Sequence, residues 1–262
     1  MFEQRSIDDD LEAVRDEHAP EALVLNAESD FETLSPSVTE SLLLLVDDVE
    51  PLSYPAEWLP DDAPEMLSSV VSSDFTVGVP GDGGVAWTRQ TDPPIVFYKP
   101  RLAGSPTGFV DFLLAEAFVE IGVGVPETFI GFFESDYREL SSVVPLDSAD
   151  TYQLAAALFD AYVGLQTRPI FSEWEATYPR LYEEYEDAGR RLEPRIEGLP
   201  GEVARGETDF AAATELACSG LKHGLELPTP FAALDTTAYS RHGAEYAVQW
   251  AKKTLEALES SE

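Results

Sequence analysis

The sequence predicts an α+β protein that is mostly α-helical, with a small antiparallel meander of three to four strands covered by a central helix and followed by a C-terminal helical bundle. Two patterns support this fold class. Strand-like runs bounded by turn residues are confined to residues 74–133, and apolar residues at helical spacing fill most of residues 147–262. A length of 262 residues allows one large domain or two small ones. We expect segments 1–73, 74–146 and 147–262 to pack into one globular unit.

The first segment, residues 1–73, is acidic and predicted to be helical. Ser35 and Pro36 form a good N-cap and first-turn pair. Apolar residues then recur at helical spacing, namely Val38, Leu42, Leu45, Val46 and Val49. Prolines between residues 51 and 64 predict a connection with little regular structure.

Strands are predicted at residues 75–79, 85–89 and 95–99. Turn residues 80–84 separate the first two strands, and Asp92-Pro93-Pro94 separates the second from the third. Because short connections join neighbouring strands, an antiparallel meander is expected. Residues 128–133 are expected to add a fourth strand.

A central helix is predicted after Ser105 and Pro106. Its main apolar stripe comprises Val110, Leu113, Leu114, Ala117, Phe118 and Ile121. Phe109, Phe112 and Val119 are apolar on its other sides. A helix that is apolar all round is buried, so we expect this one to be nearly surrounded and to cover the sheet.

Four further helices are predicted at residues 150–166, 173–192, 209–221 and 244–258, with Thr208 as the cap of the third. Prolines and glycines mark the expected loops, which contain Pro169, Pro194, Pro200, Gly201, Pro228 and Pro230. These helices form the C-terminal bundle of the predicted fold.

The chain is strongly acidic, with 50 acidic residues, 16 basic residues and a formal net charge of −34. Carboxylates of this density hold hydrated K⁺ or Na⁺, and molar salt screens their repulsion because the Debye length is about 3 Å at 1 M. Only four of the basic residues are lysines. This composition is typical of cytoplasmic proteins from halophilic archaea that accumulate salt. A hydrophobic content of 44% argues against a disordered acidic chain.

The charge also disfavours some partners. Binding to nucleic acid or to an anionic membrane needs clustered lysine and arginine, and the sequence has no basic run. Residues 1–12 lack the apolar core of a signal peptide, and the longest purely apolar run, residues 42–46, is far shorter than the ~20 residues of a membrane span. We expect a soluble, cytoplasmic protein that binds neither nucleic acid nor membrane.

One region is positively charged and is a candidate anion-binding site. Residues 83–110 contain a single acid, and the site would combine Lys99, Arg101, Ser105, Thr107 and Arg89 near the start of the central helix. Helix N-termini favour anions, and arginine forks bind carboxylate or phosphate. The glycine spacing fits neither a P-loop nor a dinucleotide fingerprint. In the alternative interpretation these cations pair with the protein's own carboxylates.

An aromatic stripe is the second candidate. Trp174, Tyr178, Tyr182 and Tyr185 recur at helical spacing and are a hypothetical protein interface, because tyrosine and tryptophan are frequent at interfaces. Packing into the core explains the same stripe equally well.

No catalytic, metal or cofactor site is predicted. Glu116 and Glu120 are stacked at i, i+4 on the central helix, but no histidine partners accompany them. Cys218 and His223 match no zinc spacing, and no serine-histidine-aspartate pattern is present. We therefore expect no metal and no cofactor.

Residues 94–133, which read PIVFYKPRLAGSPTGFVDFLLAEAFVEIGVGVPETFIGFF, resemble an uncharacterised protein family of unknown function from halophilic archaea. This resemblance implies a cytoplasmic, high-salt setting and no established activity.

Two functions from different classes follow. The favoured one is a non-enzymatic module that binds another protein or forms a homo-oligomer. The other is a protein that binds a small molecule or nucleotide, or an enzyme, using the Lys99 and Arg101 loop as an anion clamp. An enzymatic role is not indicated by any motif.

A potassium chloride titration followed by circular dichroism tests the halophile interpretation. We expect helical signal and thermal stability to increase as salt rises toward molar concentration, because screening relieves the repulsion between carboxylates. Structure that is unchanged in dilute buffer and weakens with salt would contradict this expectation.

Overall fold

The computed structural model describes residues 2–259 and divides them into two compact units. The first unit comprises the residues up to Ala56 together with Glu65–Thr128 and Glu173–Glu184. The second comprises Glu57–Pro64, Phe129–Ser172 and the residues from Tyr185 onwards. Helices account for 59% of the described residues, which confirms the mostly α-helical α+β class.

The first unit contains all the strands of the described chain and several helices. In chain order its elements are β1 (Phe2–Gln4), α1 (Asp9–His18), β2 (Leu23–Ala27), α2 (Pro36–Leu42), β3 (Asp48–Val49), α3 (Glu65–Val71), β4 (Val85–Thr88), β5 (Thr91–Asp92), β6 (Ile95–Tyr98), the 3₁₀ turn η2 (Pro100–Leu102), α4 (Thr107–Val123), α8 (Trp174–Thr177) and the first part of α9 (Pro179–Ile196). The 3₁₀ turn η1 (Ala56–Trp58) begins at the last residue of its N-terminal segment.

The main sheet has four strands in the order β1-β2-β6-β4, and it is mixed rather than a meander. β4 and β6 are antiparallel neighbours as predicted, but β2 lies parallel to β6 on its other side. The predicted strand at residues 75–79 is wrong. Its Val77 N–H donates to Glu32 O at 2.7 Å, so this segment follows residues 32–34 instead of joining β4.

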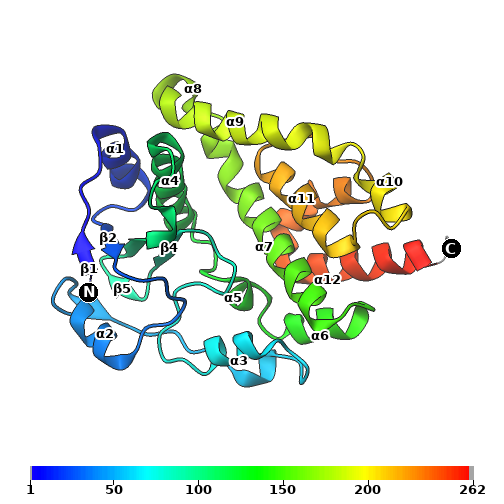
Figure 1. Cartoon of the computed structure of the whole chain (residues 1–262), viewed down its shortest axis with the longest axis horizontal. Coiled ribbons are helices and arrows are strands. Elements are labelled where there is room, and N and C mark those ends of the chain that lie inside the picture. Colours follow the sequence, from blue (N-terminus) through cyan, green and yellow to red (C-terminus); the bar gives the residue numbers. More distant parts are fainter. Residues whose placement is uncertain (1, 260–262) are drawn as a thin grey trace. The chain divides into compact units, whose positions relative to one another are not determined.

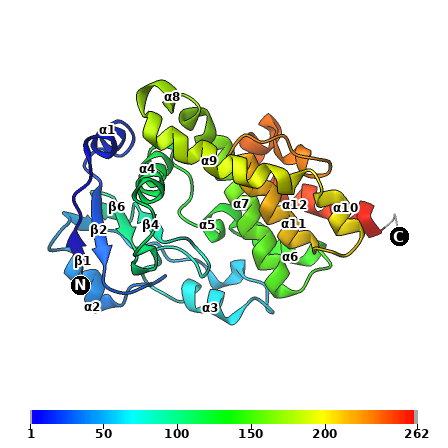
Figure 2. The ribbon, with the colours of Figure 1, turned by 45° about the horizontal axis from the view of Figure 1, so that its top comes forward.

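Helix α4 is the centre of the first unit. Ten of its residues are buried, including the large side chains of Phe112, Phe118 and Ile121. It contacts α1, β4 and β6, and it lies beside α1 in both views of the ribbon (Figures 1 and 2). The indole N–H of Trp87 on β4 donates to a carboxylate oxygen of Glu120 on α4 at 2.6 Å. Most of the predicted central helix is thus buried, whereas Phe109 in its first turn is 41% exposed.

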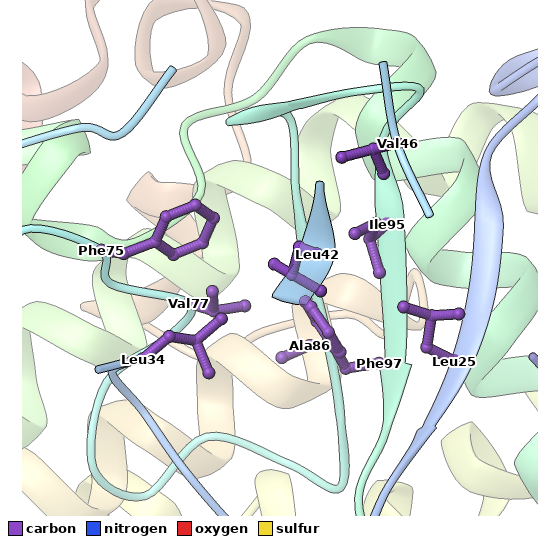
Figure 3. Close-up of a cluster of buried hydrophobic side chains, with 9 residues drawn as sticks. All are labelled: Leu25, Leu34, Leu42, Val46, Phe75, Val77, Ala86, Ile95 and Phe97. Atoms are coloured by element: carbon purple, nitrogen blue, oxygen red, sulfur yellow. The ribbon is translucent and has the colours of Figure 1, made fainter. Parts of the chain in front are cut away.

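The opposite face of the sheet has its own hydrophobic core (Figure 3). Side chains alternate along a strand, so Ile95 and Phe97 of β6 reach this core while Val96 lies on the α4 face. The cluster joins the sheet to α2 and to the extended segment around residue 75, and its members are Leu25, Leu34, Leu42, Val46, Phe75, Val77, Ala86, Ile95 and Phe97.

Arg180 at the start of α9 ties three segments of the first unit together. Its guanidinium donates to Asp8 at 2.5 Å and to Asp10 at 3.4 Å, both at the start of α1. It also donates to Asp111, a buried carboxylate on α4. One planar cation thus satisfies carboxylates from two helices that pack on each other.

The second unit is helical throughout the described part of the chain. Its elements are α5 (Phe129–Phe133), α6 (Asp136–Val143), α7 (Ser148–Phe171), the remainder of α9, α10 (Leu199–Ala204), α11 (Phe210–Lys222), the 3₁₀ turn η3 (Phe231–Leu234) and α12 (Thr237–Glu259).

Helices α7 and α11 form the centre of the second unit. Small residues on both helices allow their backbones to approach closely. A Cβ atom at Gly164 of α7 would lie only 2.8 Å from the Cα of Lys222, so only glycine fits there. Tyr239 of α12 is fully buried against α7, where its hydroxyl donates to Leu158 O at 2.5 Å. The C-terminal helical bundle predicted from the sequence is present.

Several predicted boundaries differ from the structure. The fourth strand predicted at residues 128–133 is wrong: residues 129–133 are helical, because Phe129, Ile130 and Phe133 reach the core together at helical spacing. Pro169 and Pro194 do not mark loops, since each lies near the last turn of a helix.

Other differences concern helix ends. The helix that starts at Pro36 stops at Leu42, and residues 173–192 form two helices separated at Tyr178. Asp209, and not Thr208, caps α11 by accepting from Ala212 N–H. Helix α12 starts before residue 244 and has a kink at Gly243.

Replacing Arg180 should destabilise the protein. In Arg180→Met the buried carboxylate of Asp111 loses its cation, and we expect a loss of about 1–3 kcal/mol in the free energy of unfolding. Urea denaturation followed by circular dichroism measures this loss. Arg205→Met is the matched control, because Arg205 pairs with Glu207 in an exposed loop and its removal should cause no measurable change. Equal losses in both variants would contradict the assignment.

Candidate functional site

The five residues of the predicted anion site do not come together. Arg89 follows β4 and Lys99 follows β6, and antiparallel neighbours place these positions at opposite ends of the sheet. Ser105 and Thr107 lie at the start of α4, where no side-chain cap bond forms. Only Lys99 and Arg101 share one environment, in which they interact electrostatically.

Arg101 is engaged by the protein itself. Its Nε donates to Asp30 at 3.0 Å, and its Nη2 lies 3.6 Å from a carboxylate oxygen of Glu32. Its Nη1 donates to the main-chain oxygen of Asp82 at 2.9 Å. The arginine fork therefore holds the residue 30–32 segment and the glycine-rich turn, which comprises residues 78–84. This matches the alternative interpretation of these cations.

Lys99 is different, because it is completely buried and its ammonium has no hydrogen-bond partner among the residues that the structure describes. Its Nζ lies 5.3 Å from the centre of the Phe31 ring, within reach of a cation–π contact. Burial lowers the pKa of Lys99, and the attraction of Asp82 and Glu32 opposes this effect. Lysine is seldom buried without a partner, so this position is the most unusual one of the predicted site.

Asp82 lies in the glycine-rich turn, and Gly84 of this turn accepts from the main-chain N–H of Lys99 at 2.8 Å. One carboxylate oxygen accepts from the main-chain N–H of Val79 at 2.7 Å. Burial raises the pKa of Asp82, while the Val79 N–H, Lys99 and Arg101 act to lower it. Sequence reasoning treated this turn only as a strand connection. The signal that the sequence offered for a charged group in this turn was an aspartate between two glycines.

Glu127 is a second partly buried carboxylate that the sequence did not single out. It accepts from the hydroxyl of Thr88 at 2.9 Å, from the main-chain N–H of Arg89 at 2.7 Å and from the amide of Gln90 at 2.9 Å. Burial raises its pKa and these donors lower it. Arg89 donates to Val125 O at 2.6 Å. Glu127 and Arg89 thus connect the end of β4 to the chain that follows α4.

The aromatic stripe is mostly buried. Trp174, Tyr178 and Tyr185 belong to the cores of their own units, and Tyr182 is partly exposed. Trp174 and Tyr178 meet edge to face with ring centres 5.6 Å apart, and the Tyr185 hydroxyl donates to Lys222 O at 3.1 Å. Packing within the protein accounts for these positions.

Exposed apolar side chains occur elsewhere, in the turn after α2. We name residues Leu43–Leu45 the leucine turn. Leu43 is 52% exposed, Leu44 is 86% exposed and Leu45 is 41% exposed. A run of five apolar residues, 42–46, cannot bury every member on one side of a helix. The sequence contained this signal, but reasoning from spacing alone placed Leu45 on the apolar stripe of the predicted helix.

Other residues considered for catalysis or metal binding are Glu116, Glu120 and Cys218, and each lies within the packed interior or is bonded to a neighbouring side chain. Glu116 is buried on α4, and Glu120 accepts the Trp87 indole N–H. Cys218 is fully buried, and burial raises its pKa, which is unfavourable for a thiolate nucleophile. Within residues 2–259 no cluster of histidine, cysteine, aspartate and glutamate is suited to hold a metal ion.

The fold and these positions define a mostly α-helical α+β protein with a buried lysine under a glycine-rich turn and an exposed leucine turn. The chain belongs to a family of unknown function (DUF7089), whose family model matches residues 1–258. This agrees with the resemblance to an uncharacterised family. No curated protein and no solved structure matches the chain. No helix within the described residues has the length and apolarity to cross a membrane.

The buried ammonium of Lys99 should produce a pH-dependent stability. Unfolded Lys99 has the ordinary pKa of 10.5, whereas in the folded protein its pKa is lower. Between these two values unfolding takes up a proton, so raising the pH favours the folded state, by at most about 1.4 kcal/mol per pH unit. We expect Lys99→Met to lose this contribution, so that wild type gains stability relative to the variant as pH approaches 10.5.

Urea denaturation of both proteins across alkaline pH measures the difference. The other charged groups around Lys99 are Asp82, Glu32, Asp30 and Arg101, and all remain in the variant. Lys253→Met, at an exposed position of α12, is the control and should follow the wild-type curve. Parallel curves for wild type and Lys99→Met would contradict a lowered pKa.

Proposed function

We propose that the protein is a non-enzymatic binding module of the archaeal, high-salt cytoplasm, and that its leucine turn docks onto another protein. The observation that carries this proposal is the exposure of three consecutive leucines on an ordered turn. Large exposed apolar side chains that cluster together are typical of interaction sites.

The leucine turn is held in place at both ends. Leu42 and Val46 flank it and are buried in the core on the α2 face of the sheet (Figure 3). Its backbone continues the helical bonding of α2, with Leu45 N–H donating to Leu42 O at 2.7 Å. Asp47 N–H then donates to Asp92 O at 2.7 Å. Because the turn is already ordered, docking requires little loss of conformational freedom.

The chemistry of the partner follows from the charges next to the turn. The exposed residues Glu40, Asp47, Asp48 and Glu50 surround it in the sequence, and we name them the acidic rim. No lysine or arginine occurs between Arg15 and Arg89. A partner with an apolar groove bordered by lysine and arginine complements both features. Association of two copies through this surface would bring two acidic rims together, which disfavours a homodimer.

Affinity capture from cells of the native source, at their own salt concentration, tests the proposal. The wild type is compared with Leu43→Ser/Leu44→Ser and with a control, Met66→Ser, which removes an exposed apolar side chain from α3. The partner recovered with wild type and control is then purified, and its dissociation constant is measured for all three proteins. We expect the double variant to bind at least about tenfold more weakly, a loss of about 1.4 kcal/mol.

The charge of the partner is tested separately. Asp47→Asn/Asp48→Asn keeps the shape of the acidic rim and removes two charges, so the association rate should fall. Equal capture by the wild type and the leucine variant would overturn the proposal. A leucine-dependent homodimer in sedimentation experiments would overturn the choice of a basic partner and identify a second copy as the occupant.

A further inference from the structure

The glycine-rich turn at residues 78–84 covers a cation that has no counterpart elsewhere in the described chain: a completely buried ammonium without a hydrogen-bond partner. Ile95 and Phe97 lie on one face of β6 (Figure 3), and Lys99 follows them at the same alternation. The main-chain N–H of Lys99 donates to Gly84 O at 2.8 Å. The main chain of Lys99 is therefore bonded to the last residue of the turn.

The carboxylate of Asp82 attracts Lys99 electrostatically but forms no hydrogen bond with its ammonium. Val79 N–H donates to this carboxylate at 2.7 Å, and Arg101 holds the main-chain oxygen of the same residue at 2.9 Å. Lys99 and Arg101 both attract it electrostatically. A main-chain N–H, a lysine and a nearby arginine are the groups that proteins use to bind carboxylate and phosphate ligands.

The turn that carries Asp82 contains two glycines with positive φ. Gly78 has φ +101° and Gly81 has φ +94°, values that few other residues adopt. Asp82 is partly exposed, and Gly81 and Gly83 on the turn are exposed, whereas Lys99 beneath is not. Displacing the Asp82 side chain is thus the direct way to bring Lys99 into contact with solvent or a ligand.

We propose that Asp82 fills an anion-binding site of which Lys99 is the cation, and that a small ligand with a carboxylate or phosphate group displaces it as the turn opens. The ligand gains the Val79 N–H and the unpartnered ammonium, and Asp82 moves into water. This site contains fewer residues than the anion clamp predicted from the sequence, because Ser105, Thr107 and Arg89 take no part in it.

A purely structural lysine fits these observations less well. Lysine inside a fold is normally paired, and replacement of an isolated buried charge by an apolar side chain tends to stabilise the protein. Here the nearby carboxylate bonds to a main-chain N–H, while the ammonium keeps its donors unused. Unused donors beside a displaceable carboxylate are the arrangement expected of a site that awaits a ligand.

Thermal unfolding in titrations of inorganic phosphate and of acetate tests this site. Ionic strength is held constant with potassium chloride, and the proteins are wild type, Asp82→Ala, Asp82→Ala/Lys99→Met and the control Asp61→Asn. Asp61 is a highly exposed carboxylate paired with Arg138, far along the sequence from the turn. The phosphate and acetate arms distinguish the two ligand classes.

We expect the unfolding temperature of wild type and of Asp61→Asn to rise and then level off as anion is added. Both proteins should reach half of this rise at the same anion concentration. Asp82→Ala should saturate at a concentration at least tenfold lower, because the competing carboxylate is gone. The double variant should not respond. If Asp82→Ala does not fold, Asp82→Asn is used, since its side-chain oxygen still accepts from Val79 N–H.

Three results would overturn the proposal. A double variant that responds like Asp82→Ala would show that the anion binds without Lys99. Equal half-saturation in wild type and Asp82→Ala would show that Asp82 does not compete. A wild type that responds to neither anion would show that Asp82 is a fixed part of the fold and is never displaced.

Discussion

The constraint on which the first unit depends is the apolar circumference of α4. A helix with apolar residues on every side must be covered on every side, and a single sheet face cannot do this. Helix α1 contacts it as well as β4 and β6. Its few polar side chains are then bonded one by one, as with Glu120 to the Trp87 indole and Asp111 to Arg180. In the N-terminal segment, helix α1 packs against α4 and so covers a side of α4 that the sheet does not reach.

The scarcity of cations shapes the polar interactions. With 16 basic residues against 50 acidic ones, several arginines each bind more than one acceptor. Arg180 binds carboxylates of α1 and α4, and Arg101 binds the residue 30–32 segment and the glycine-rich turn. Arg138 holds Leu59 O and Asp61 in the second unit. Lys99 differs from these arginines, because its ammonium has no hydrogen-bond partner among the described residues. The leucine turn is unusual for a different reason, since its side chains are exposed to water.

Much of the fold was predictable because its signals are local. The helical stripe of α4, the long helices of the second unit and the strands β4 and β6 all follow from spacing within a short stretch. The errors concern pairing across the chain. β2 was missed because its five residues lie in an acidic segment with helical character, and it is a strand through its pairing with β1 and β6. Residues 75–79 have strand composition but pair with residues 32–34.

The sequence by itself determined the charge, the class of fold and the identity of the unusual cations, because composition and periodicity need no partner to be recognised. It marked Lys99 and Arg101 but not their difference. Tertiary structure decided that Arg101 is neutralised by Asp30 and Glu32 while Lys99 is buried beside Asp82. It also decided that Leu42 and Val46 point inward and the three leucines between them outward. Burial and pairing depend on residues far away in the chain, and a single sequence does not specify which distant residues meet.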